Sequence, residues 1–318
     1  MSTQTSGFQL KRRLDLIRRA GVAIGGIILF LIFSILTDKF LTPNNLREIA
    51  LQSSINAIIA IGMTLVIIIA GIDLSVGSVV GLTGMLTASL LPTNLGLGMV
   101  VGLLLGVVCG LANGLLIAKL RLPAFIVTLG ALSIYRGAAL IYTNGQPIYG
   151  IDKTFRAIFA GKVAEIPTPV LLALIVAAVI YLVMRYTTLG EQIVAVGGNE
   201  EAARLSGINV DRVKITVYAI SGLLSTLAGY VLIGRIGAAE PIGGTGYELD
   251  AIGAAVIGGA SLLGGEGSVV GTLIGAVMLG GLRNGLTLLN VQSYWQFVAT
   301  GAVVILAVVA DHVTRRRR

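Results

Sequence analysis

Long, continuous apolar runs separated by short polar stretches fill the chain from about residue 20 to residue 310. A helix needs about 20 mainly apolar residues to cross the hydrocarbon core of a bilayer. Because the apolar residues do not alternate with polar ones, they predict membrane-spanning helices and not a transmembrane β-barrel. We expect an all-α polytopic membrane protein with about ten spans, some short or broken, at about 20–36, 55–71, 77–91, 97–118, 124–142, 170–184, 215–233, 251–263, 268–282 and 294–310.

The polar stretches predict the layout around these spans. Basic residues cluster near both ends and in a few loops, as expected if they stay on the inner side of the membrane. Residues 1–19 are predicted to form a cytoplasmic amphipathic segment, 20–311 the transmembrane domain and 312–318 a basic cytoplasmic tail. A short interfacial helix is predicted at 44–52, and the stretch 185–214 is predicted to be a cytoplasmic loop.

The loop 185–214 contains the signature of a short helix. Asn199 is a good N-cap, and Glu200 and Glu201 follow in the first turn, where the helix dipole favours acidic side chains. Gly207 is a typical helix terminator. A capped helix between two apolar spans suits contact with another protein at the membrane surface, although a solvated loop helix is an equally ordinary interpretation.

Two ionisable residues interrupt apolar runs and are candidates for a substrate pathway. Asp73 lies in a glycine-flanked break after the second span, which leaves open a stand-alone ion-coupled carrier. Arg136 lies within the fifth span, where it equally suits a contact between helices or a side chain that snorkels outward. A neutral polar solute would suit uncharged groups, and the candidates, each of which could instead hydrogen-bond between helices, are Gln52, Asn56, Asn113, Tyr142 and Asn144.

Glycine spacing gives two further expectations. Gly102, Gly106, Gly110 and Gly114 form one stripe on the fourth span, which favours close helix packing over a pathway. The string GSVVG, preceded by AIG at a similar distance, occurs at 77–81 and again at 267–271. This echo indicates a possible internal repeat, as in many transporters.

Composition excludes several classes of function. The chain has 318 residues, is 55% hydrophobic and 12% charged, and has a net charge of +8 that topology explains without nucleic acid. One cysteine, Cys109, and one histidine, His312, predict no metal site and no Ser/His/Asp or Cys/His catalytic set. No phosphate-binding loop is present, so the chain is not expected to be an enzyme. If ATP is used, another subunit must bind it.

At Glu201-Ala202-Ala203 and Gly207 the loop resembles the EAA-x3-G loop of ABC importer permeases. No Leu-Pro pair follows Gly207, a departure typical of the sugar branch. Further strings resemble the ribose-type permeases of bacterial monosaccharide importers: GIDLSVG at 71–77, GGNE at 197–200, LSGINV at 205–210 and GTGYELDAI at 244–252. The resemblance extends over about residues 44–311 and is nearest to ribose permeases, although xylose, galactose and autoinducer-2 permeases share most of these strings.

The resemblance implies the transmembrane subunit of an ATP-driven importer in the bacterial cytoplasmic membrane. Its partners would be a second permease copy, ATPase subunits that bind ATP and Mg²⁺, and a periplasmic or lipid-anchored sugar-binding protein. The short helix would dock on the ATPase and carry its closure into the membrane, so that the sugar passes by alternating access. The residues implied in this coupling are Asn199, Glu200, Glu201, Ala202, Ala203, Arg204, Gly207 and Ile208.

Overall fold

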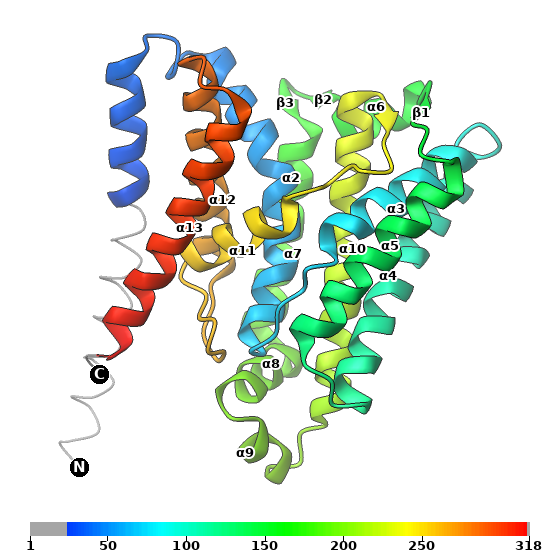
Figure 1. Ribbon diagram of the computed structural model, residues 1–318, viewed down its shortest axis with the longest axis vertical. Helices are drawn as coiled ribbons and strands as arrows, with labels where there is room; N and C mark the ends of the chain where they lie inside the picture. Colours follow the sequence, from blue (N-terminus) through cyan, green and yellow to red (C-terminus); the bar gives the residue numbers. More distant parts are fainter. Residues whose placement is uncertain (1–23, 317–318) are drawn as a thin grey trace.

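The computed structural model describes residues 24–316 as a bundle of helices (Figure 1). The expected segment 1–19 and the last two residues lie outside the described part. The bundle begins with an apolar helix at Ile24–Leu36. The helices that follow are α2 (Pro43–Ile68), α3 (Val76–Leu90), α4 (Leu95–Lys119), α5 (Ala124–Thr143), α6 (Lys153–Ala160), α7 (Thr168–Tyr186), α8 (Thr188–Gly198), α9 (Glu200–Leu205), α10 (Val210–Ile236), α11 (Tyr247–Ile257), α12 (Val269–Leu288) and α13 (Ser293–Arg316).

Within the described residues, six helices are long and apolar enough to cross a membrane. They are α2, α4, α5, α7, α10 and α12, and three shorter apolar helices lie at Ile24–Leu36, Val76–Leu90 and Ser293–Leu306. The chain is therefore an all-α, multi-pass membrane protein. The expected number of ten spans stays a prediction.

The structure corrects the interfacial helix predicted at 44–52, because α2 is one continuous helix that contains both this segment and the second span. Pro43 occupies the first turn, where its missing N–H costs nothing. The polar triplet Gln52-Ser53-Ser54 suggests a boundary, but the Ser54 hydroxyl donates to the carbonyl of Leu51 over 2.7 Å and the helix continues.

The segment predicted as a span at 251–263 is also different in the structure. Helix α11 has 11 residues and ends at Ile257, too short to cross a bilayer. Gly259 then adopts a φ of +95°, which suits glycine, and irregular chain continues to Ser268. At the other end of the sequence, α13 runs to Arg316 and includes the first residues of the predicted tail.

Helices α2 and α10 supply much of the buried core. The glycine stripe of α4 packs against α10, as the spacing predicts. A Cβ atom at Gly110 would lie 2.8 Å from Ala219 Cα, and one at Gly114 would lie 2.8 Å from Ile215 Cα. Close approach of the two backbones therefore depends on the absence of side chains at these positions.

Both copies of the sequence echo lie at a helix–break–helix unit. One break joins α2 to α3, and the other joins α11 to α12. The two breaks meet, because the Gly265 amide donates to the Ile68 carbonyl over 2.8 Å. This contact brings the two echoed units together at one end of the bundle.

The two ends of the bundle differ in structure (Figure 1). At one, the α6 end, lie α6 and two small antiparallel pairs. Strand β1 (Ile148–Tyr149) pairs with β4 (Ala238–Ala239), and β2 (Lys162–Val163) pairs with β3 (Ile166–Pro167). At the other, the α9 end, lie α8, α9 and the C-terminal part of α13.

Candidate functional site

Helix α9 is the predicted short helix of the loop, and its sequence signals act as expected. The Asn199 side chain caps it by accepting from the Ala202 amide over 2.9 Å. Gly207 adopts a φ of +84° just after the helix, and the Ile208 amide donates back to Ala203 over 3.1 Å. The sequence therefore fixes both ends of this helix.

One face of α9 is held by the bundle and the other is open. Ala203 is 4% exposed, whereas Leu205 is 84% exposed and Glu201 is also at the surface. Leu205 therefore presents an apolar side chain on the open face of α9.

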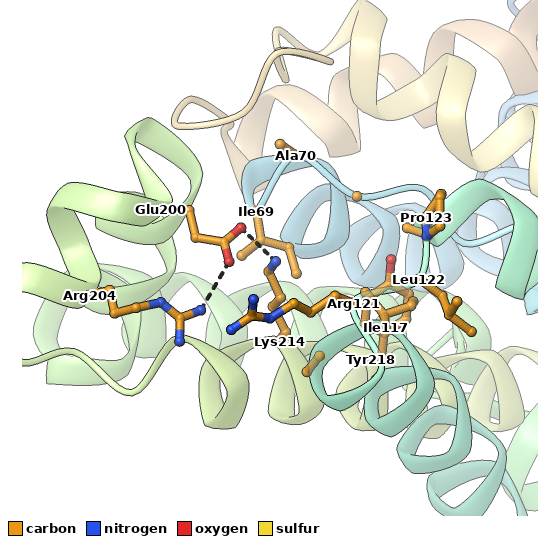
Figure 2. Close-up of a pocket in the computed structure, with 13 residues that line it drawn as sticks. Ile69, Ala70, Ile117, Arg121, Leu122, Pro123, Glu200, Arg204, Lys214 and Tyr218 are labelled. Atoms are coloured by element: carbon orange, nitrogen blue, oxygen red, sulfur yellow. Dashed lines mark hydrogen bonds and ion pairs between the residues drawn. The ribbon is translucent and has the colours of Figure 1, made fainter.

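Ion pairs fix α9 to α10 (Figure 2). Lys214 Nζ donates to Glu200 Oε2 over 2.7 Å, and Arg204 Nη2 donates to Glu200 Oε1 over 3.3 Å. The hydrogen bond from Lys214, together with both positive charges, holds the pKa of the Glu200 carboxyl below its usual range. Glu200 therefore holds α9 on α10 through its ion pair with Lys214.

Directly before α9, the end of α8 is wedged between two backbones. A Cβ atom at Gly197 would overlap the Ile68 carbonyl and lie 2.7 Å from the Gly265 nitrogen. A Cβ at Gly265 would lie 3.0 Å from Gly198 Cα. This contact, called here the glycine junction (Ile68, Gly197, Gly198, Gly264 and Gly265), connects α9 to both helix breaks.

Asp73 lies in the break between α2 and α3, where it is 2% exposed. Its Oδ1 accepts from the Ser75 hydroxyl at 2.6 Å, and its Oδ2 accepts from the Ser221 hydroxyl at 2.9 Å. Asn113 Nδ2 donates to Ser75 Oγ at 2.8 Å, and Tyr135 donates to Asn113 Oδ1 at 3.1 Å. The structure thus joins two predicted pathway residues, Asp73 and Asn113, in one buried network across α3, α4, α5 and α10.

Arg136 connects α5 to the segment after α10. Its Nη1 donates to the carbonyls of Pro241 and Gly243 at 2.8 and 3.0 Å. Of the alternatives for this arginine, the structure therefore shows a contact between segments of the chain.

The remaining predicted pathway residues are dispersed. Gln52 and Asn56 lie one turn apart on α2, and the buried Asn56 Oδ1 has no hydrogen-bond partner among the described residues. Tyr142 and Asn144 lie at the α6 end, where Tyr142 contacts the Ser89 hydroxyl and Asn144 takes a left-handed conformation after α5. These four residues do not form one site with Asp73.

Sequence reasoning assigned no role to a buried ion pair between α11 and α12. Arg283 Nη2 donates to Asp250 Oδ1 over 2.6 Å, and Asp250 is 1% exposed. The Asp250 Oδ2 atom has no partner among the described residues. Arg283 lies at the end of an apolar run, much as Arg136 lies within one. A basic residue in that position was the sequence signal that could have indicated a buried ion pair.

Comparison with known proteins identifies the family to which the chain belongs. Residues 45–308 match the family described as branched-chain amino acid transport system / permease component. The chain is 45% identical to the ribose import permease protein RbsC of Haemophilus influenzae, with 98% of each chain covered. It is 46% identical to RbsC of Escherichia coli K12, covering 98% of this chain and 99% of the relative, and 43% identical to RbsC of Bacillus subtilis, covering 92% of each. No solved structure gives a significant match.

Proposed function

The chain belongs to the permease family of branched-chain amino acid type transport systems, and we propose that it is the transmembrane subunit of an ATP-driven ribose importer. Relatives named as ribose import permeases cover nearly the whole chain at 43–46% identity, which supports ribose as the solute. They also favour an importer subunit over the stand-alone ion-coupled carrier that Asp73 had left open. ATP hydrolysis, with Mg²⁺, belongs to a separate ATPase subunit in this proposal.

We propose that α9 is the helix that docks on the ATPase. The observation that carries this proposal is the contrast between the buried Ala203 and the 84% exposed Leu205 on one helix of six residues. The ion pairs of Glu200 hold the helix on the bundle, so that Glu201 and Leu205 stay available to a groove in the partner. A rigidly held helix transmits force better than a loop, because little motion is absorbed at its base.

The proposed topology has ten crossings with both termini in the cytoplasm. Six long helices and three shorter apolar helices give nine, and α11 with its flanking chain supplies the tenth in this proposal. The α9 end then faces the cytoplasm and the α6 end faces the binding protein. A hollow of about 410 Å³ at the α6 end has Lys153, Arg156 and Arg235 in its wall, which suits acidic side chains on that partner.

Transport would require a second copy of the chain, with the sugar path between the two copies. Asp73, Asn113 and the polar residues of α2 stay candidates for shaping that path. In this proposal Asp73 and Asn113 act by fixing the α2–α3 break, because their polar atoms already bond within the chain.

The test is a substitution of the exposed anchor, Leu205→Asp, with Leu205→Met as the control that preserves size and apolarity. Burying a leucine side chain contributes about 1.5–3 kcal/mol, so we expect Leu205→Asp to weaken co-purification with the ATPase at least about tenfold and to abolish ribose uptake. Membrane insertion of both variants should match the wild type, and Leu205→Met should retain uptake.

Two results would contradict the proposal. Normal uptake and ATPase binding by Leu205→Asp would remove α9 from the docking surface. Ribose transport by the purified chain alone in liposomes, without any ATPase, would point to a stand-alone carrier.

A further inference from the structure

A hollow with a positively charged wall lies beside α9 (Figure 2). It lies between the α2–α3 break, the α4–α5 connection, α9 and α10, and has a volume of about 320 Å³. Sites for small molecules have volumes of about 300–1,000 Å³. Three cations, Arg121, Arg204 and Lys214, contribute to the wall against one carboxylate, Glu200. Subtracting one negative from three positive charges leaves a surplus of two.

Arg121 is the cation of this wall that has no direct partner among the described residues, because its charge acts on Asp211 only at longer range. Glu200 already binds Lys214 and Arg204, and the nearby Asp211 binds Lys119 at 3.0 Å. Arg121 has no hydrogen bond or ion pair with any other residue in the described range 24–316. Its side chain nevertheless extends toward Lys214 and Arg204 (Figure 2). A guanidinium with free donors beside two further cations is a ready site for phosphate oxygens.

The other wall of the hollow is apolar and continues onto the surface of the bundle. Ile69, Ile117 and Leu122 line the hollow. Just outside it, Leu120 at the end of α4 and Phe125 in the first turn of α5 are exposed. A free inorganic anion would gain nothing from this surface, whereas an amphiphile would place its apolar part there.

We propose that this hollow binds the headgroup of an anionic phospholipid, with its phosphate at Arg121 and its acyl chains along Leu120, Leu122 and Phe125. Basic pockets between transmembrane helices are suited to such headgroups. The bound phosphate would connect the α4–α5 turn to α9 and α10, and so stabilise the base of α9. The site is made from this chain alone, and only its placement in the inner leaflet rests on the proposed function.

The test measures lipid binding to the full-length purified chain by native mass spectrometry in detergent. The probes are phosphatidylglycerol, phosphatidylcholine with the same acyl chains, and inorganic phosphate. The wild-type chain should retain phosphatidylglycerol in preference to phosphatidylcholine. Arg121→Gln should weaken phosphatidylglycerol binding about fivefold, the effect of one basic residue near a lipid surface, and leave phosphatidylcholine unchanged.

Arg185→Gln is the matched control, because Arg185 is an exposed arginine in the last turn of α7 and outside the hollow. It should retain wild-type lipid binding. Equal losses in the two variants, equal retention of the two lipids, or displacement of phosphatidylglycerol by inorganic phosphate at the same concentration would each overturn the proposal. Because no ATPase is present, the result is independent of whether α9 docks on one.

Discussion

Asp73 shows how a single carboxylate can hold a helix break in place. Its oxygens accept from the Ser75 amide, the Ser75 hydroxyl and the Ser221 hydroxyl. A buried carboxylate with all of these partners fixes the turn between α2 and α3 and attaches it to α10. The structure therefore gives Asp73 a positioning role, and this role has a measurable signature.

Asp73→Asn and Asp73→Ala should differ sharply. Asparagine retains an acceptor for Ser75, and the Ser221 hydroxyl can rotate to accept from the new amide, so the loss of stability should be small. Alanine leaves the buried donors unpaired, each costing about 1–3 kcal/mol. Thermal unfolding in detergent would measure both, with ribose uptake as the second readout. Equal stability of the two variants would contradict the positioning role.

Gly110 makes a similarly sharp prediction. Gly110→Ala should destabilise the bundle by about 1–3 kcal/mol, because its Cβ would lie 2.8 Å from Ala219 Cα on α10. Gly130→Ala on α5 is the control, since no atom lies within 4 Å of its added Cβ. It should be neutral or stabilising by about 0.5–1 kcal/mol. The melting temperatures of both variants test this, and equal shifts would argue against packing as the reason for the stripe.

At this scale, sequence predicts what depends on near neighbours along the chain. The cap at Asn199 and the terminator at Gly207 follow local rules, and both are present. The partners of Asp73 were not predictable, because Ser221 is 148 residues away and meets it through the packing of α10. Asp250 and Arg283 were missed for the same reason.

At the scale of elements, α9 has a predicted dependence on acid. The pKa of Glu200 is lowered in the folded chain, chiefly by the hydrogen bond from Lys214. A lowered pKa means that the ionised carboxylate stabilises the docked helix above the usual glutamate range, and that this contribution is lost as the pH falls through the lowered value. Hydrogen exchange of residues 199–206 should therefore accelerate, after correction for intrinsic rates, below about pH 4.

Glu200→Gln is the control for this dependence, because a neutral amide does not titrate. Its exchange in 199–206 should be faster at neutral pH and nearly independent of pH after the same correction. If the wild type and Glu200→Gln showed the same acid profile, the ion pairs of Glu200 would not be what holds α9.

Sequence patterns located most helices but placed several boundaries wrongly, and the errors share a cause. The polar residues Gln52 to Ser54 suggest a helix boundary, yet α2 continues through them. The apolar, glycine-containing segment 251–263 suggests one helix, yet α11 ends at Ile257. In both places, tertiary packing and not the local sequence sets the boundary. Helix α8 was not predicted within the loop 185–214, because its glycines resemble turn residues. In the structure Gly190 and Gly197 are needed for close contacts with Met184 and Ile68.

At the scale of the whole molecule, the proposed orientation can be tested by chemical labelling. Tyr149 at the α6 end is 74% exposed and Leu205 at the α9 end is 84% exposed. The background is Cys109→Ala, which removes the only native cysteine. In that background, Tyr149→Cys should react with a membrane-impermeant maleimide in cells whose outer membrane is permeabilised and whose cytoplasmic membrane is intact. In cells that lack the ATPase subunit, Leu205→Cys should react only after the cytoplasmic membrane is permeabilised, and the reverse pattern would invert the topology.

The sequence alone predicted the class of molecule because a bilayer imposes long apolar helices on any chain that crosses it. The segment 251–263 is already too short in the sequence to cross a bilayer untilted, but the sequence did not predict that its helix ends at Ile257. Helix α3 (Val76–Leu90) is short because it follows the break after α2, and α11 is short because it precedes the break before α12. Both breaks pack inside the bundle, and such packing depends on the folded chain as a whole.

The glycine junction sets a boundary for exchanging parts between relatives. Up to Gly198 the chain meets the bundle backbone to backbone, so even a methyl group at Gly197 would collide with Ile68. In the segment 199–208, the contacts with α10 include ion pairs from Glu200 to Lys214 and from Arg204 to Asp211, and Ala203 is buried. In the proposed assembly, a graft of residues 199–208 from another permease, with Glu200, Ala203 and Arg204 kept, should transfer the choice of ATPase while leaving the membrane domain intact.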